Sequence, residues 1–404
     1  MVKRFLALAL LLSGWPMARA EHGAPAHPAA AAPATGWALR QAVARPLAIS
    51  AAFDGQGRLW LARVEQRHVW VSRSTDGGAS FDRATRVNAE PEAIAADGEN
   101  RPKIAIAGDG TVHVSWTVSL AKPYTGHVRY ARSTDGGSTW SPPITVNDDA
   151  AEASHRFESL LVRGDRVVLA WLDGRERKAA QATGRTMAGN SLYYTVSDDA
   201  GVHFTRNRRA VENTCECCRV ALAWQGEHPA VLWRHVYPGN IRDFALARLD
   251  DAAPPRRVSD DQWELDGCPH HGGALATDAE GRVHLVWYTQ GKARQGLFYR
   301  SLDRDALSEP VKFGNDQAQA GHPAVIASAS SVILAWREFD GQAYSVWTQR
   351  SRDRGVTWEP PCRLLSSETA ADYPLLIARQ GQPWLVWNSE REGIRVLPLE
   401  GSES

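Results

Sequence analysis

A short apolar segment that ends in or beside a tryptophan recurs along the chain. It occurs seven times, and successive tryptophans are 49 to 62 residues apart. The seven residues are Trp60, Trp116, Trp171, Trp233, Trp287, Trp336 and Trp387. No segment shows a convincing 3.6-residue period, which argues against helices. A repeat of this length fits a four-stranded sheet, so the pattern predicts an all-β propeller with these tryptophans in its core.

A second repeat, Ser-x-Asp-x-Gly-x-x-aromatic, occurs four times. The copies span residues 74–81, 133–140, 197–204 and 351–358. In this order the residues suit the tip of a β-hairpin, because the carboxylate can accept hydrogen bonds from loop N–H groups and glycine tolerates a positive φ. We therefore expect four turn-forming aspartates, namely Asp76, Asp135, Asp199 and Asp353.

Each unit is expected to contain four strands. Examples are 103–106 and 324–326 for the first strand, 128–131 and 192–195 for the third, and 144–146 and 363–365 for the fourth. The seventh unit has no candidate for a fourth strand. Residues 37–43 could supply that strand from the other end of the chain and close the ring, which would remove open sheet edges. The prediction is a propeller of seven four-stranded blades, with six blades as the alternative.

The first residues have the composition of a secretory signal peptide. A basic start is followed by an apolar run over 5–17 and by Ala18-Arg-Ala20. The alternative is an uncleaved anchor, but the apolar run is shorter than the roughly 18 residues that span a membrane. We therefore expect a signal peptide over 1–20, an Ala/Pro-rich linker over 21–36 and a propeller domain over 37–404, in a protein that is periplasmic or secreted, with no membrane span in the mature chain.

Composition narrows the possible partners. The 404 residues include 46 Lys and Arg and 46 Asp and Glu, so there is no net charge to attract nucleic acid. At 43% hydrophobic residues the chain can bury a large core. We expect a monomer whose ligand is a small anion or a glycan. The five cysteines, in an exported protein, are candidates for disulfides or for metal ligands.

Chemically active residues recur just before the first strand of successive units. In a propeller these positions meet at one end of the central channel, opposite the Asp-containing hairpins. The residues are Arg45, Asn100, Arg101, His155, Arg156, Cys215, Cys217, Cys218, Arg219, Cys268, His270, His271, His322, Asp372 and Tyr373.

Two neighbouring units bring cysteine and histidine to this end. The segments are Cys215-Glu-Cys217-Cys218 and Cys268-Pro-His270-His271, with His322 in the next unit. Thiolate and imidazole together suit zinc or copper, and sulfur favours Cu(I). The alternatives are two disulfides, for instance Cys215 to Cys268 and Cys217 to Cys218, or unpaired thiols. One disulfide could also frame a metal site made by the histidines.

The remaining candidates are a set of arginines that could bind an anion, one long loop and one isolated cysteine. Arg101, Arg156 and Arg219, with His155, could bind an anionic ligand. The alternative is salt bridges between blades, with partners such as Glu158 and Glu216. The segment 173–191 is either a basic lid or a solvated insertion. The fifth cysteine, Cys362, is expected to be a buried, inert thiol.

The hairpin motif and the strand rhythm resemble the Asp-box (BNR-repeat) propellers of the sialidase superfamily, over essentially the whole mature chain. The resemblance implies that Tyr373 is a nucleophile and that Arg45 and Arg219 grip a substrate carboxylate. The family has a third arginine that grips the carboxylate. This sequence departs from that pattern, because the corresponding place in the fifth unit has Cys268-Pro-His-His271. The sequence thus predicts a metal-binding or redox site, with an exo-glycosidase for acidic sugars or a non-catalytic glycan- or protein-binding propeller as alternatives.

Overall fold

The computed structural model describes residues 46–399. The predicted signal peptide, the linker, the closing strand over 37–43 and Arg45 lie outside the described residues. Within the described part, no helix is long and apolar enough to cross a membrane.

The described chain is a succession of antiparallel β-meanders. The first four contain β1 (Ile49–Phe53), β2 (Leu59–Glu65), β3 (His68–Ser74) and β4 (Thr85–Arg86); β5 (Lys103–Ile106), β6 (Val112–Ser119), β7 (Gly126–Ser133) and β8 (Ile144–Thr145); β9 (His155–Arg163), β10 (Arg166–Asp173), β11 (Asn190–Ser197) and β12 (Arg208–Thr214); and β13 (Ala221–Gln225), β14 (His228–Tyr237), β15 (Ile241–Arg248) and β16 (Arg256–Arg257).

The last three meanders complete the described chain. They contain β17 (Ala274–Thr277), β18 (Val283–Gln290), β19 (Gln295–Asp303), β20 (Ala306–Leu307) and β21 (Val311–Phe313); β22 (Gly321–Ala327), β23 (Val332–Phe339), β24 (Tyr344–Ser351) and β25 (Cys362–Ser367); and β26 (Leu375–Arg379), β27 (Gln382–Ser389) and β28 (Gly393–Pro398). The all-β class and the antiparallel sheets are therefore confirmed. Among residues 46–399, three sheets have four strands, the third and fourth meanders share one eight-stranded sheet through the pairing of β12 with β14, and the fifth and last meanders have five and three strands.

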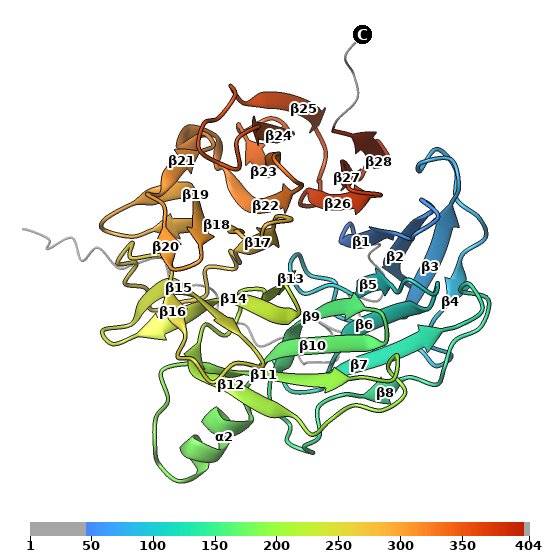
Figure 1. Cartoon of the computed structure of the whole chain (residues 1–404). Helices are drawn as coiled ribbons and strands as arrows, with labels where there is room; N and C mark the ends of the chain where they lie inside the picture. The colour runs from blue at the N-terminus through green and yellow to red at the C-terminus, as the bar shows by residue number, and fades with distance from the viewer. Residues whose placement is uncertain (1–45, 400–404) are drawn as a thin grey trace, which may run out of the picture.

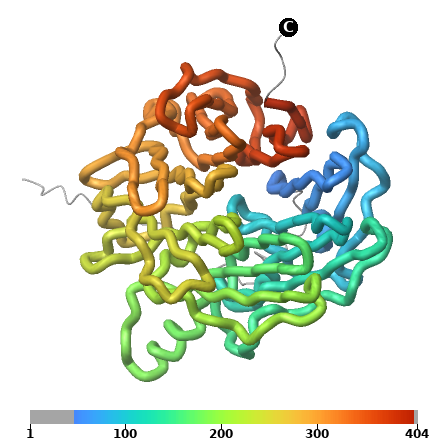
Figure 2. The backbone as a smooth tube through the Cα atoms, in the orientation of Figure 1, coloured from blue at the N-terminus to red at the C-terminus, as the bar shows by residue number. Residues whose placement is uncertain are grey.

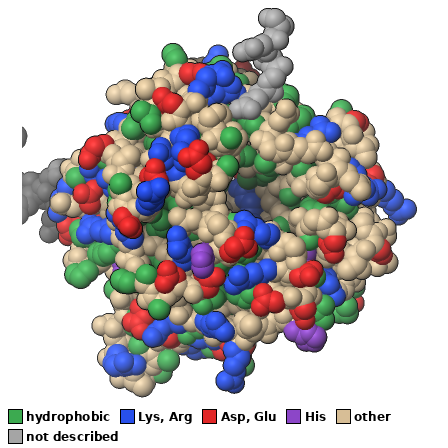
Figure 3. All heavy atoms as spheres, viewed as in Figure 1, with side chains coloured by type: hydrophobic (Ala, Val, Ile, Leu, Met, Phe, Trp, Pro, Cys, Tyr) green, Lys and Arg blue, Asp and Glu red, His purple; other side chains and the backbone are tan. Residues whose placement is uncertain are grey.

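The meanders follow one another around a circle (Figures 1 and 2). The first strand of each meander contacts the first strand of the next, and β26 contacts β1. The short strands β1, β5, β9, β13, β17, β22 and β26 consequently form the inner ring. The space-filling view shows a hollow near the middle of this face, with Lys and Arg side chains in it (Figure 3).

The seven repeated tryptophans form the core between the sheets. Each lies on the second strand of its meander and is no more than 2% exposed. Several indole N–H groups also donate to a carboxylate, as Trp171 does to Asp173 at 2.8 Å and Trp287 to Asp261 at 2.7 Å. The polar edge of each ring thus has a partner while its apolar faces are buried, which is the arrangement expected of a core aromatic.

The Asp-containing hairpins repeat one hydrogen-bond pattern. In the second copy, Ser133 donates to Asp135 at 2.8 Å, and the N–H groups of Ser138 and Thr139 donate to the same carboxylate. The Thr139 hydroxyl is the main cause that lowers the pKa of Asp135 to about 2. In each copy the carboxylate is used to close the turn.

The segment 173–191 contains a helix, which the sequence pattern did not predict. Helix α2 (Arg175–Ala182) lies in it, and a short 3₁₀ helix, η1 (Asp316–Ala318), lies elsewhere. Arg175 is held by Asp173 and Asp148, both at 2.8 Å, and its guanidinium lies over the ring of Tyr193. The segment is therefore anchored by its first arginine, instead of being a loop of unpaired basic residues.

Candidate functional site

Three cysteines lie in the connection between β12 and β13. The Cys215 N–H donates to the Arg234 carbonyl at 2.9 Å, next to the pair Thr214–His235 that links β12 to β14. This pairing fixes the start of the connection on the neighbouring meander. Cys215, Cys217 and Cys218 are 1%, 5% and 2% exposed, so all three thiols are buried.

The three buried sulfurs converge without bonding to one another. The Sγ atom of Cys215 is 3.8 Å from that of Cys217 and 3.5 Å from that of Cys218. A disulfide requires about 2.05 Å. All five cysteines are unpaired, so the two disulfides considered from the sequence are absent from the described structure.

A second group of ligand atoms shares Cys217 with the first. Cys217, Cys268 and His270 bring one ligand atom each within 4.8 Å of one another, and Cys268 and His270 are exposed. The backbone of His270 has φ 53°, in the left-handed region that a non-glycine residue occupies only at a cost. We call the five residues Cys215, Cys217, Cys218, Cys268 and His270 the cysteine cluster.

Charge around the buried sulfurs favours one thiolate. The thiols of Cys217 and Cys218 hydrogen-bond to the Cys215 sulfur and lower the pKa of Cys215 well below its usual value. The Arg242 guanidinium also donates to this sulfur at 3.2 Å. The same hydrogen bond to Cys215 raises the pKa of Cys217, whereas burial is the main cause that raises the pKa of Cys218. These contacts favour ionisation of Cys215 over that of Cys217 or Cys218.

Glu216 joins the cluster to its surroundings. Its carboxylate accepts from Arg242 at 3.1 Å and from Arg177 of helix α2 at 3.3 Å. Arg242 donates further to the Leu265 carbonyl at 2.9 Å. The helix, the Cys-rich connection and the segment before Cys268 are thus tied together by one chain of polar contacts.

His271 and His322 lie apart from the cysteine cluster. They belong to a row of stacked rings. The ring centroid of His271 lies 4.1 Å from that of Tyr288 and 4.4 Å from that of His322, and the centroids of His322 and Tyr373 are 3.5 Å apart. Burial lowers the pKa of His271 to about 3 and that of His322 to about 4, so both rings are neutral at pH 7. Neither belongs to a converging group of metal ligands among the described residues.

The side chain of Glu99, in the second meander, hydrogen-bonds to residues of three other meanders. Its carboxylate accepts the Gly272 N–H at 2.9 Å, the Arg219 N–H at 3.2 Å and His322 Nδ1–H at 3.3 Å. Burial alone would raise the pKa of Glu99, but the charge of Arg219 and then the hydrogen bond from His322 lower it well below its usual value. An ionised carboxylate therefore links the second meander to the fourth, fifth and sixth.

The predicted anion-binding arginines are largely occupied. Arg101 makes a two-pronged ion pair with Asp372 at 2.6 and 2.7 Å, and Arg156 pairs with Asp97 at 3.3 Å. Arg219 donates to the carbonyls of Gly273 and Pro323. The salt-bridge alternative is supported, with Asp372, Asp97 and Glu99 as partners of the arginines.

His155 is inaccessible to a ligand in this structure. It is 0% exposed, its Nδ1 lies 2.7 Å from the Gly126 carbonyl, and its Nε2 lies 3.0 Å from Asp149. These contacts fix the connection before β9. Tyr373 is half-buried, and burial is the main cause that raises its pKa.

The sequence reasoning missed several residues that follow the buried tryptophans. Arg234, Tyr288 and Arg337 each come directly after the tryptophan of a second strand, where side-chain alternation points them away from the tryptophan face. Arg337 lies 4.7 Å from the centre of the Tyr373 ring. Glu99 was missed although it immediately precedes the predicted pair Asn100 and Arg101. The residue after each repeated tryptophan and the residue before Asn100 would have had to be added to the candidates to find them.

The prediction for Cys362 is wrong. This residue begins β25 and is exposed, not buried. It lies at the outer strand of its sheet, where the predicted apolar environment is lacking. Its exposure makes it a useful control, since it is a thiol outside both converging groups.

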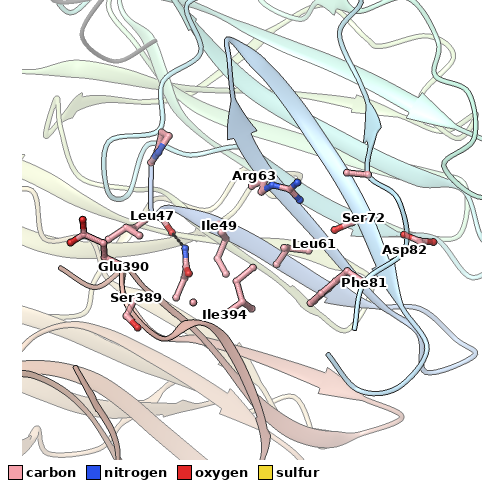
Figure 4. A pocket seen from close by; sticks show the side chains of 14 residues that line it. Leu47, Ile49, Leu61, Arg63, Ser72, Phe81, Asp82, Ser389, Glu390 and Ile394 are labelled. Atoms are coloured by element: carbon pink, nitrogen blue, oxygen red, sulfur yellow. Dashed lines mark hydrogen bonds between the residues drawn. The ribbon is translucent and has the colours of Figure 1, made fainter. Parts of the chain in front are cut away.

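A cleft lies between the first and last meanders (Figure 4). Its volume is about 330 Å³. Leu47, Ile49, Leu61, Phe81 and Ile394 form its apolar lining. The side chain of Asn388 donates to the Leu47 carbonyl at 2.8 Å and joins its two sides. None of the predicted site residues within 46–399 lines it.

Comparison with solved structures supports the fold. An ulvan lyase of a polysaccharide lyase family matches with TM-score 0.58 at 12% identity, covering 89% of this chain and 94% of that one. The BP39L lectin from Burkholderia pseudomallei matches with TM-score 0.55 at 11% identity, covering 87% and 98%. A Penicillium chrysogenum α-L-arabinanase matches with TM-score 0.48 at 12% identity, covering 73% and 89%. Neither family models nor curated protein sequences give a match. At these identities the likeness defines the fold class alone.

Proposed function

We propose that this protein binds one Cu(I) ion through the buried thiols Cys215, Cys217 and Cys218. The observation that carries the proposal is the convergence of three buried, unbonded sulfurs, with separations from Cys215 of 3.5 and 3.8 Å. Metal–thiolate bonds of roughly 2.3 Å place neighbouring sulfurs about 3.8 Å apart around a tetrahedral ion and about 4.0 Å apart around a trigonal one. The three sulfurs therefore need to move little to surround a metal.

The number of ligands favours copper over zinc. Structural zinc sites almost always have four ligands, whereas the converging groups among the described residues of this cluster contain three members each. Soft thiolates select Cu(I). Burial of the three sulfurs also excludes competing oxygen ligands, since each cysteine is at most 5% exposed.

The surrounding charge supports the same ion. Three thiolates with one Cu(I) leave a net charge of about −2, and Arg242, which already donates to Cys215 at 3.2 Å, offsets part of it. Binding would release the protons of Cys217 and Cys218, so the apparent affinity should rise with pH. Export, as predicted from residues 1–20, would place these thiols in an oxidising compartment, where a bound metal protects them from disulfide formation.

A competition titration tests the proposal. Reduced protein is titrated anaerobically with Cu(I) against bicinchoninate, and separately with Zn(II) against a chromophoric chelator. We expect one Cu(I) per chain and much weaker binding of Zn(II). Preferential binding of zinc, or no copper bound by the reduced protein, would refute it.

We further propose that the seven meanders are the seven blades of an Asp-box propeller related to the sialidase superfamily. The closed circle of contacts among the first strands and the four repeated hairpin tips support this interpretation.

A second candidate function is binding of an acidic sugar at the end of the ring near Tyr373. Two cations there, Lys103 and Arg337, donate to the carbonyls of Arg101 and Ala371. Burial lowers the pKa of Lys103 to about 8, although the charge of Glu158 acts in the opposite direction. The matched ulvan lyase was solved bound to a glucuronate-containing saccharide. A role for Tyr373 as a glycosidase nucleophile has less support, because the His322 ring covers one face of it at 3.5 Å.

Removing one of these cations tests the second function. Arg337→Ala is expected to weaken binding of a glucuronate- or sialate-containing oligosaccharide about 10-fold, because its positive charge is lost. Isothermal titration calorimetry measures this, with Arg256→Ala at a distant surface as the control. Unchanged saccharide affinity in Arg337→Ala would exclude the binding role of that charge.

A fluorogenic sialoside assay tests the glycosidase. Equal and negligible turnover by wild type and by Tyr373→Phe would exclude it.

A further inference from the structure

The cysteine cluster contains two ligand groups of different character that share one residue. Cys215, Cys217 and Cys218 are all buried, whereas Cys268 and His270 of the second group are exposed. Cys268 and His270 come from the connection between β16 and β17, on the neighbouring meander. Cys217 is the member common to both, so its sulfur can contact an ion in either position.

We infer that Cys217, Cys268 and His270 form an entry position, from which Cu(I) passes to the buried sulfurs. This inference rests on the proposed function of the buried group. A metal ion at the surface would meet Cys268 and His270 first, because no other member of the cluster is exposed. Two sulfurs and one imidazole bind Cu(I) less strongly than three thiolates, since sulfur is the softer ligand. Transfer of Cu(I) from the entry position to the three buried thiolates is therefore favourable.

The transfer is a ligand exchange in which no electron moves. The Cu–S bond to Cys268 and the Cu–N bond to His270 break, while bonds to Cys215 and Cys218 form and the bond to Cys217 persists. Any proton on the Cys215 sulfur and the proton of the Cys218 thiol leave to solvent as the new Cu–S bonds form, and the Cys268 sulfur takes up a proton or keeps its charge at the surface. Cys215 accepts a hydrogen bond from Arg242 at 3.2 Å, and its sulfur lies 3.8 and 3.5 Å from those of Cys217 and Cys218, so it is the natural first inner ligand.

The backbone at His270 fits such a role. Its φ of 53° places a non-glycine residue in the left-handed region, which structures maintain only where the surroundings impose it. His271, the next residue, is fixed by stacking between Tyr288 and His322. The packed neighbour thus holds the chain while the His270 side chain remains at the surface. The metal donor that suits this position is a carrier with soft ligands that gives up Cu(I) by exchange.

The experiment separates the rate of metal uptake from affinity. Transfer of Cu(I) from its bicinchoninate complex is followed by stopped-flow absorbance, and affinity is measured by equilibrium competition. The double variant Cys268→Ser, His270→Ala is expected to take up copper at least 10-fold more slowly, with affinity reduced less than about threefold. Cys362→Ser, which removes an exposed thiol elsewhere, should match wild type in both measurements.

Three outcomes would overturn the inference. An unchanged uptake rate in the double variant would show that the entry position does not exist. A loss of affinity as large as that of Cys215→Ser would mean that all five residues form a single site. Two tightly bound Cu(I) ions per wild-type chain would mean that the two positions are filled together. Failure of wild type to bind copper would instead refute the proposed function itself.

Discussion

Cys215→Ser is expected to lower the affinity for Cu(I) at least about 100-fold, or about 2.8 kcal/mol. Cys215 is central to the buried group, because its sulfur lies 3.5 and 3.8 Å from those of Cys218 and Cys217, and Arg242 donates to it. A hydroxyl is a hard and poorly ionised ligand at neutral pH, so it does not replace the thiolate. Anaerobic competition with bicinchoninate measures the change.

The control for this variant is Cys362→Ser, which removes a thiol from the exposed start of β25. Its affinity should equal that of wild type. Near-ultraviolet circular dichroism of both variants checks that the buried tryptophans keep their environment. Equal affinities of Cys215→Ser and wild type would contradict the assignment of the buried thiols.

Glu99→Gln is expected to destabilise the fold by about 3 kcal/mol at pH 7. The carboxylate is buried and links three other meanders through Gly272, Arg219 and His322. The amide is neutral and has one acceptor atom where the carboxylate has two, so it leaves Arg219 without a charged partner. Urea unfolding, followed by tryptophan fluorescence, gives the free energy of unfolding.

The effect of Glu99→Gln should depend on pH with a definite sign. The charge of Arg219 and the His322 hydrogen bond hold the folded-state pKa of Glu99 below its ordinary value of 4.5. The stabilisation is therefore fully present above pH 4.5 and is lost as the pH falls through the lower, folded-state pKa. The difference between wild type and variant should shrink between pH 5 and pH 3. The exposed Glu227→Gln is the control, and a difference that grows in acid would contradict this account.

The repeated patterns predict the sheets well because they report local physics. A tryptophan on each second strand must be buried, and a Ser-x-Asp-x-Gly turn closes through its own side chains, as Ser133 and Asp135 do. These constraints act within one meander. They accordingly identify strands such as 103–106 with the bounds that the structure has.

The candidate site was predicted in part, because its members are set by contacts between meanders. The sequence places Cys215, Cys217, Cys218, Cys268 and His270 at one end of the ring, and the structure brings their ligand atoms together. His271 and His322 carry the same side chain but are directed to the row of stacked rings. Which histidine turns toward the sulfurs depends on Tyr288 of the same unit, which stacks on His271, and on Glu99 and Tyr373 of other units, which contact His322.

The central claim is that three buried thiolates surround one Cu(I) ion. X-ray absorption at the copper edge of the loaded wild-type protein tests it most directly, because the spectrum reports the kind, number and distance of the ligand atoms. The account predicts three sulfur neighbours at roughly 2.3 Å, with no nitrogen or oxygen in the first coordination sphere. A sphere made mainly of nitrogen or oxygen atoms, or one with a single sulfur, would contradict it.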